Sequence, residues 1–241
     1  MCVSVFRSGG DRVEIKKIFR RYEQKYVISK ELAEIVMMEA EKRMAEDPFG
    51  ETDIMNIYYD TPDNRLIRNS IEKPTFYKEK LRLRCYGVPK DDSKAFIELK
   101  KKYDSVVYKR RLSLPYAEAL KALEKAELPD TQIGRELDYF LRFYGSLAPA
   151  MTISYHRKAY IEGDFRLTFD SNVLYRRENL DLRLGIFGEE VTDKVIMEMK
   201  SPTAIPFWML EIMSRYNIRK VPFSKYGTAY TKEKLEEKKN G

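Results

Sequence analysis

The stretch that most constrains the fold is the heptapeptide Lys80–Tyr86, in which basic and apolar residues alternate. Side chains of an extended strand point to opposite faces in turn. The basic residues therefore share one face and the apolar residues the other: Lys80, Arg82 and Arg84 against Leu81, Leu83 and Cys85. Basic rows on neighbouring strands repel one another unless an anion lies among them. The alternation predicts a sheet with one strongly basic face.

The same alternation recurs along the chain and predicts eight strands. They span Phe19–Ile28, Ile54–Thr61, Phe76–Tyr86, Lys94–Tyr103, Val106–Leu114, Met151–Ile161, Phe165–Asp170 and Lys194–Lys200. Apolar residues at helical spacing predict helices over 30–46, 115–126, 131–144 and 203–216, and a last helix that begins after Ser224. Residues 172–192 fit neither period and are expected to be irregular.

The direction of the charged faces decides the architecture. Pointing outward, they would be ordinary solvated surfaces, but five helices would then lack an apolar sheet face to cover. Pointing inward, they leave the apolar rows free to pack against the helices. The sequence therefore predicts an α+β fold with one closed eight-stranded antiparallel β-barrel, which has no free sheet edge, and helices packed on the outside.

The chain contains no internal repeat and no linker-like composition, so its 241 residues are expected to form one domain. Residues 1–17 read as a loose lead-in and residues 232–241 as a solvated tail. The two cysteines, Cys2 and Cys85, are not expected to form a disulfide. No signal peptide is evident, and no stretch approaches the ~20 apolar residues of a membrane span. A soluble, cytoplasmic protein is expected.

A formal net charge of +7 and a pI near 9.1 favour an anionic partner. A barrel lined with Lys and Arg must be wide and wet, because burying unpaired cations in a dry interior is prohibitive. A duplex does not fit inside an eight-stranded barrel, so nucleic acid is disfavoured as the main ligand. A triphosphate or polyphosphate, held by arginine forks and lysine charges, is the ligand that this lining predicts.

A minority of carboxylates on the charged faces suggests a divalent metal. Mg²⁺ and Mn²⁺ prefer carboxylate, phosphate and water oxygens, and they need only one or two protein ligands. Glu198 and Glu23 are the candidates, whereas the single His156 disfavours a histidine-based metal site or triad. The sequence contains no CxxC pair and no Gly-rich phosphate loop. Phosphoryl transfer, which depends mainly on positioning and charge neutralisation, suits such a site.

The charged segments resemble the CYTH-like triphosphate tunnel metalloenzyme superfamily, specifically its VTC-domain polyphosphate polymerases. Superfamily members characteristically carry Glu-x-Glu-x-Lys on the first strand, and Arg21–Lys25 matches with Arg in place of the first Glu, as in the VTC branch. The resemblance runs from about residue 19 to residue 230. The further matches are Tyr59–Pro62, Arg82-Leu-Arg84, Glu98-Leu-Lys100, Lys109-Arg-Arg111, Tyr155-His-Arg157, Glu198-Met-Lys200 and Ser224-Lys225-Tyr226.

The resemblance implies a phosphotransferase that moves the γ-phosphate of ATP to the end of a growing polyphosphate chain and releases ADP. It implies that Glu198 holds the divalent metal, Mn²⁺ or Mg²⁺. The residues expected to act in catalysis are Lys25, Arg82, Arg84, Lys100, Arg157 and Glu198. Those expected to bind phosphate are Arg21, Lys25, Lys80, Arg82, Arg84, Lys100, Lys109, Arg111, Tyr155, Arg157, Lys200, Ser224 and Lys225.

Two other functions fit the same residues. A triphosphatase or nucleotide cyclase would use the same architecture, and a non-catalytic protein would bind polyphosphate or nucleic acid without turnover. Tyr58, Tyr59 and Tyr103 are candidates for stacking on a nucleotide base.

Overall fold

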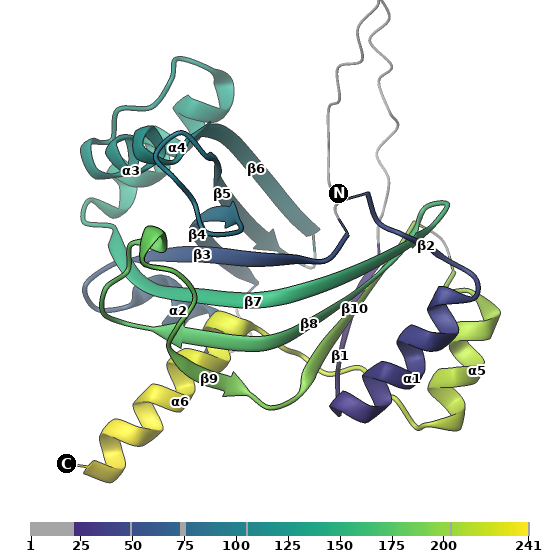
Figure 1. Ribbon diagram of the computed structural model, residues 1–241. Helices are drawn as coiled ribbons and strands as arrows, with labels where there is room; N and C mark the ends of the chain where they lie inside the picture. The colour runs from purple at the N-terminus through teal and green to yellow at the C-terminus, as the bar shows by residue number, and fades with distance from the viewer. Residues whose placement is uncertain (1–21, 49, 73–75, 105, 203, 241) are drawn as a thin grey trace, which may run out of the picture.

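The computed structural model describes residues 22–48, 50–72, 76–104, 106–202 and 204–240, and its strands belong to one antiparallel sheet. The sheet is built on an eight-strand path (Figure 1). In spatial order the path runs through β1 (Tyr22–Ile28), β10 (Val195–Ser201), β8 (Phe165–Arg176), β7 (Ala148–Glu162), β3 (Thr52–Asp60), β4 (Tyr77–Tyr86), β5 (Lys94–Tyr103) and β6 (Val106–Pro115). Two short strands lie beside it, with β2 (Ala45–Glu46) paired to β7 and β9 (Glu189–Thr192) paired to β8.

The sheet curls into a half-barrel, which confirms the predicted eight antiparallel strands but differs from a closed ring. Among the described residues, β1 pairs only with β10, and β6 pairs only with β5. The two ends of the path approach each other through side chains instead, because Lys100 of β5, the neighbour of end strand β6, lies 3.9 Å from Glu23 of β1.

Helices cover the convex side of this half-barrel (Figure 1). They include α1 (Lys30–Glu41), α3 (Tyr116–Lys125), α4 (Gln132–Tyr144) and α5 (Phe207–Arg215), while the short α2 (Arg65–Ile71) follows β3. Side-chain caps fix two of the helix starts. Ser29 Oγ accepts from the Leu32 amide at 3.2 Å, and Thr131 Oγ1 accepts from the Gly134 amide at 3.0 Å.

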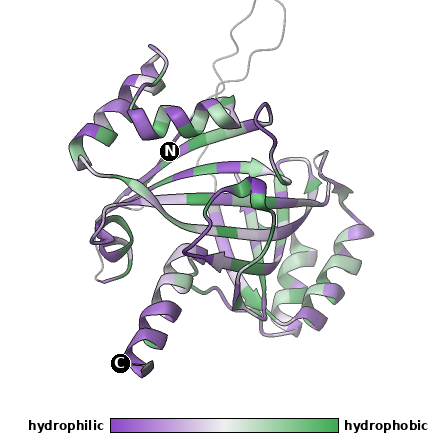
Figure 2. Ribbon diagram, turned by 60° about the vertical axis from the view of Figure 1, so that its left-hand side comes forward, coloured by the Kyte–Doolittle hydropathy of each residue, from purple (hydrophilic) through white to green (hydrophobic). Residues whose placement is uncertain are grey.

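The apolar rows of the sheet face these helices, as the sequence predicts. Leu83 and Cys85 of β4 are buried in a core that includes Leu137 and Phe140 of α4. A second core joins β1, β8 and β10 to α1 and α5; its members include Tyr26, Val36, Leu167, Met197 and Met209. Figure 2 shows the resulting alternation of hydrophobic and hydrophilic residues along the strands.

The last helix, α6 (Lys225–Asn240), packs on the concave side, unlike the outer position predicted for the helices. Its Tyr226, Ala229 and Tyr230 join inner-face residues such as Ile153 and Ile196 in a third core. Residues 232–240, expected as a solvated tail, belong to this helix. One part of the concave face is therefore apolar and covered by α6, and the charged part lies beside it.

The region 172–192, expected to be irregular, is partly ordered into strands. β8 continues to Arg176, and β9 returns to pair with it. Asn172 has a left-handed backbone conformation, with φ of 49°, next to a break in the β7–β8 register. This irregularity shifts the in–out alternation, so the continuation of the strand does not show in the sequence pattern.

Replacing Leu83 with Ala tests the outer core. Leu83 is 0% exposed, so the substitution removes buried methyl groups and leaves a cavity. We expect the free energy of unfolding in urea to fall by about 2–5 kcal/mol. Leu235→Ala on α6, where the side chain is 56% exposed, serves as the control and is expected to change it by less than about 0.5 kcal/mol. Similar losses in both variants would contradict this assignment of the core.

Candidate functional site

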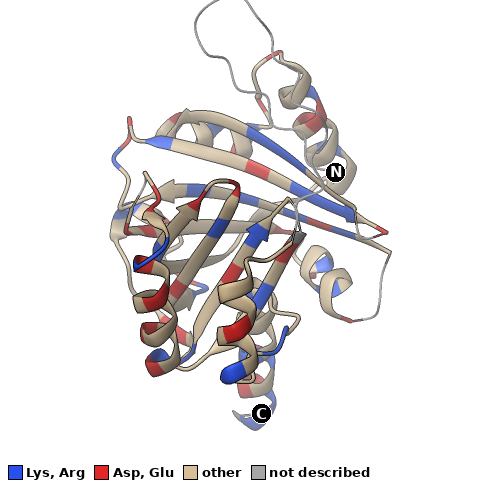
Figure 3. Ribbon diagram, turned by 90° about the vertical axis from the view of Figure 1, so that its right-hand side faces the viewer, with Lys and Arg blue, Asp and Glu red and all other residues tan. Residues whose placement is uncertain are grey.

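The sheet register places the charged side chains of the concave face in rows across neighbouring strands. Lys80 lies opposite Lys100, and Lys100 lies opposite Lys109, so three lysines stand side by side on β4, β5 and β6. The next row runs from β3 to β6 and contains Tyr58, Arg82, Glu98 and Arg111. Figure 3 shows how basic and acidic residues gather along these strands.

A single buried carboxylate, Glu98, holds four of the cations. It is 1% exposed and receives Arg82 Nη2 at 2.6 Å, Arg111 Nη2 at 2.5 Å and Lys109 Nζ at 2.7 Å. Arg84 Nε lies farther away, at 3.9 Å. Burial alone would raise the pKa of Glu98, but these cations outweigh burial and hold the pKa well below its usual range. Glu98 is therefore ionised and fully engaged by protein cations.

Asp170 of β8 forms a second centre of the same kind. Arg157 of β7 binds it with two hydrogen bonds, Nε to Oδ1 at 2.5 Å and Nη2 to Oδ2 at 2.7 Å. Lys225, the first residue of α6, reaches Oδ2 at 2.5 Å. Lys225 and Arg157 outweigh the effect of burial and lower the pKa of Asp170. This carboxylate thereby ties the start of α6 to the concave face.

Glu198 of β10 lies beside the Asp170 centre and is buried as well. Its neighbours on β1 and β10 are Lys25, which stands opposite it, and Lys200, whose Nζ lies 2.7 Å from Oε1. Lys200, Lys25 and Arg157 outweigh burial and hold its pKa well below the usual range. Burial disfavours the charged form of Lys25, but Glu198 and Glu23 outweigh it and raise the Lys25 pKa.

The lysine row is poorly compensated. Lys80 Nζ donates to Ser224 Oγ at 2.7 Å, and Lys100 has only the Glu23 contact at 3.9 Å within the described part of the chain. Burial, together with Lys25, Lys100 and Arg82, lowers the pKa of Lys80 to about 8. The pKa of Lys100 is lowered as well, mainly by burial. Lowered lysine pKa values are expected where cations lie close together, and a bound anion would reduce their mutual repulsion.

Every predicted site residue that the structure describes lies on this concave face, where the contacts gather them around Glu98, Asp170 and the Glu198–Glu23 pair, with Lys80 bound to Ser224. Arg21 lies outside the described residues. Sequence reasoning gave no role to Glu98 or Asp170, although both stand on the predicted charged faces. It also overlooked Asn56, which accepts from Arg84 Nε at 2.8 Å and donates to the Ile153 carbonyl at 2.8 Å. The period of two from Ile54 to Asp60 could have placed Asn56 on the inner face.

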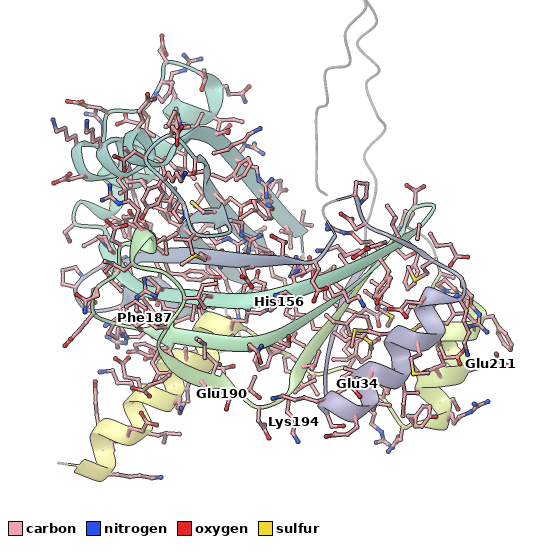
Figure 4. The ribbon with its side chains drawn as sticks, viewed as in Figure 1. Glu34, His156, Phe187, Glu190, Lys194 and Glu211 are labelled. Atoms are coloured by element: carbon pink, nitrogen blue, oxygen red, sulfur yellow. The ribbon has the colours of Figure 1, made fainter. Side chains whose placement is uncertain are left out.

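The structure confirms the predicted position of one tyrosine and excludes ligand stacking by another. Tyr155 is confirmed on the inner face, where its hydroxyl accepts from Arg84 Nη2 at 3.0 Å. Tyr59 is 4% exposed and belongs to the outer core, so it faces no ligand. Tyr103 is exposed and packs edge-to-face on Tyr77. His156, labelled in Figure 4, has its Nδ1 2.9 Å from Asp53 Oδ1 and its Nε2 2.7 Å from Glu51 Oε1. Each carboxylate contacts a different ring nitrogen, so the three groups do not converge on a metal position.

The two predicted metal ligands fit a divalent ion only in part. Glu198 faces Lys25 and Glu23 faces Lys200 across β1 and β10, so the two carboxylates are diagonal neighbours on one face. Within the described ranges, no group of three or more His, Cys, Asp or Glu side chains converges. Two carboxylates suit Mg²⁺ or Mn²⁺ when phosphate oxygens and water complete the shell. Glu98 and Asp170 each bind several cationic groups at 2.5–2.7 Å, whereas Glu198 has one such partner in the part of the chain that the structure describes, Lys200 at 2.7 Å.

A family model described as the VTC domain matches residues 20–233. The chain belongs to the VTC domain family. A search of curated proteins finds no match.

Solved structures share the fold of this VTC domain. A candidate adenylate cyclase from Bacillus halodurans is 19% identical with a TM-score of 0.54, covering 84% of this chain and 92% of its own. A candidate adenylyl cyclase from Hippeastrum, described with a dominant triphosphatase activity, is 12% identical with a TM-score of 0.50. That match covers 87% of this chain and 94% of the Hippeastrum chain. At these identities the likeness establishes the architecture alone.

None of the helices that the structure describes in this VTC domain is both long and apolar enough to cross a membrane.

Replacing Glu98 with Gln tests how the inner face is held together. The amide removes the charge that four cations share, so we expect the free energy of unfolding at pH 7 to fall by about 3–5 kcal/mol. Added inorganic phosphate should restore more stability to the variant than to the wild type, because an anion can take the place of the carboxylate. Urea denaturation measures both effects.

Glu136→Gln on α4 is the matched control, because Glu136 pairs with Arg110 on the outside at 2.6 Å. We expect Glu136→Gln to lower the free energy of unfolding by less than about 1 kcal/mol. Equal losses in the two variants would show that Glu98 does not carry the inner network.

Proposed function

We propose that this VTC domain is a divalent-metal-dependent polyphosphate polymerase, a phosphotransferase that moves the γ-phosphate of ATP onto a polyphosphate chain. The observation that supports it most is the row Lys80, Lys100 and Lys109, whose side chains stand opposite one another. Lys109 is paired with Glu98 at 2.7 Å, but Lys80 and Lys100 have no carboxylate closer than 3.9 Å among the described residues. Like charges in adjacent positions are destabilising unless a strong anion lies between them. A chain of phosphates, with one charge or more on each unit, supplies such an anion along the whole row.

The arginines would grip the phosphates while staying anchored by carboxylates. Part of the Arg82 guanidinium binds Glu98, and part of the Arg157 guanidinium binds Asp170. These bonds fix the orientation of the remaining N–H groups. Arg82 is 22% exposed and Arg157 is 11% exposed at the side chain, so parts of both remain open to the concave space. An anchored arginine loses little conformational freedom on binding, which favours tight and oriented phosphate contacts.

The remaining cations would neutralise charge where the phosphoryl group is transferred. Lys25, Lys100 and Lys200 surround Glu198, and Lys225 enters from the start of α6. Glu198 would hold Mn²⁺ or Mg²⁺, with Glu23 as the second candidate. The ion would neutralise charge on the phosphate oxygens when bound. Since phosphoryl transfer needs positioning more than covalent help, a lining of fixed cations is sufficient for this chemistry.

Transfer to phosphate rather than to water would follow from the first-strand sequence. The hydrolytic enzymes of the tunnel superfamily that this chain resembles use a pair of Glu residues, which help to bind a second metal that activates water. Arg21 replaces the first of these here. The substitution would add affinity for phosphate and weaken the second metal site, which favours a phosphate acceptor.

A triphosphatase is the second candidate, because the Hippeastrum protein of the same fold is described with that activity. A nucleotide cyclase or a non-catalytic polyphosphate binder would use the same basic lining. The products formed from ATP distinguish all four functions.

The test is to incubate the protein with ATP and Mn²⁺ and to separate the products on a gel and by chromatography. We expect polyphosphate and ADP. The variant Glu198→Gln should lower turnover by about 100-fold or more, since it removes the metal-holding charge, while tripolyphosphate binding without metal persists. Glu211→Gln, at an exposed position on α5 labelled in Figure 4, is the control and should behave as the wild type.

Inorganic phosphate without polymer would instead support a triphosphatase, and a cyclic nucleotide would support a cyclase. Tripolyphosphate binding without turnover in the wild type would leave only the binding function.

A further inference from the structure

Tyr58 of β3 is a buried phenol at the border between the charged and the apolar parts of the concave face. Its side chain is 7% exposed, and it stands opposite Arg82 on β4. The ring stacks on Tyr226 of α6, with centroids 4.5 Å apart and planes at 20°. Tyr226 is itself fixed, because its hydroxyl donates to Asp60 Oδ2 at 3.0 Å. The Tyr58 ring therefore has a defined position and is not available to stack on a nucleotide base.

The Tyr58 hydroxyl shares one feature with that of Tyr155, which the family resemblance assigns to phosphate: each accepts a hydrogen bond from an arginine of β4. Arg82 Nη1 donates to the Tyr58 oxygen at 3.2 Å, as Arg84 Nη2 donates to the Tyr155 oxygen at 3.0 Å. In both cases the arginine donates to a lone pair of the phenol oxygen. The O–H hydrogen therefore needs a different acceptor. No acceptor for the Tyr58 hydrogen occurs among the described residues, so it can be donated to a ligand.

The charges around Tyr58 all favour an anion. Lys80, Arg82 and Arg84 face it from β4, Lys25 faces it from β1, and the neutral ring of Tyr226 covers it from α6. Burial opposes ionisation of the phenol, but Arg82, Lys80 and Arg84 outweigh burial and lower the Tyr58 pKa to about 8. A phenol in this environment is a strong hydrogen-bond donor to phosphate at neutral pH.

We propose that Tyr58 is a phosphate-binding residue that donates its hydroxyl hydrogen to a phosphate oxygen held by Arg82. The proposal rests on the proposed function only in that the concave face binds phosphate chains. The neutral phenol donates, whereas the phenolate cannot donate and repels phosphate. A bound polyanion disfavours the phenolate, so it raises the Tyr58 pKa above the value of the free protein.

The sign of the pH dependence follows from this. Below pH 8 the phenol is protonated and binding needs no proton. As pH rises through about 8, the free protein loses the Tyr58 proton, so binding must recover it and affinity falls. Lys80 also has a pKa of about 8 and also favours binding when protonated, so its contribution would remain in a Tyr58 variant. A spectroscopic signal from the phenolate separates the two groups.

The test uses Tyr58→Phe, which keeps the ring stack and removes only the hydroxyl. Binding of tripolyphosphate is measured calorimetrically at pH 7 and near pH 9, and the phenolate absorbance is recorded near pH 8.5. We expect tripolyphosphate to lower the phenolate absorbance of the wild type and to leave that of the variant unchanged. At pH 7 the variant should bind roughly 10-fold more weakly, as for a lost hydrogen bond to a charged group.

Two control variants make the assignment specific. Tyr86, at the end of β4, also has a lowered pKa because Arg84 and Arg111 outweigh burial, and it is 44% exposed. Tyr86→Phe should keep both the absorbance change and the affinity. Tyr226→Phe keeps the stack but loses the bond to Asp60, and it should affect thermal stability more than binding.

The proposal is overturned if Tyr58→Phe binds as tightly as the wild type and shows the same absorbance change. If Tyr58→Phe binds tripolyphosphate normally and only Tyr86→Phe abolishes the absorbance change, Tyr58 is likewise excluded. If the wild type does not bind tripolyphosphate, the proposed function fails, and the role of Tyr58 fails with it.

Discussion

Repulsion between cations on neighbouring strands is the constraint on which the rest of the structure depends. The backbone ladder brings Lys80, Lys100 and Lys109 side by side, and they cannot be separated without breaking the sheet. Glu98 and Asp170 offset part of this charge from within the sheet. The remaining excess is tolerable only where water or an anion reaches it, because dry burial of unpaired cations is prohibitive. A half-barrel with an open concave face satisfies both the ladder and the hydration of these groups.

The same residues therefore serve the fold and the proposed chemistry. Glu98 and Asp170 hold arginines in place for the fold, and anchored arginines are what phosphate recognition requires. The apolar end of the concave face has a related role, because α6 packs there and brings Lys225 to Asp170 at 2.5 Å. The stack of Tyr58 on Tyr226 lies at the boundary between the two regions. A change to the docking of α6 would consequently alter both stability and the charged site.

Much of this architecture could be predicted because a period of two separates the faces of each strand. The alternation in Lys80–Tyr86 placed the cations inside and Leu83 in the outer core, as found. The pairing of particular carboxylates with particular cations depends on register between strands far apart in the sequence, so the role of Glu98 was not visible. Local irregularity also hides information, because the left-handed Asn172 interrupts the pattern of β8. The inner position of α6 depends on tertiary packing that no single segment specifies.

The most direct test of the central claim compares two adjacent lysines of β5 that point to opposite faces. Lys100 lies on the concave face near Glu23, whereas Lys101 lies on the convex side near Glu79, at 3.3 Å. Calorimetry would measure the affinity for tripolyphosphate in Lys100→Gln and Lys101→Gln, without metal and at one fixed salt concentration. A shared cationic cavity predicts about 10-fold weaker binding for Lys100→Gln and unchanged binding for Lys101→Gln. Equal losses in both variants would show that phosphate binds through the general surface charge and would contradict the account.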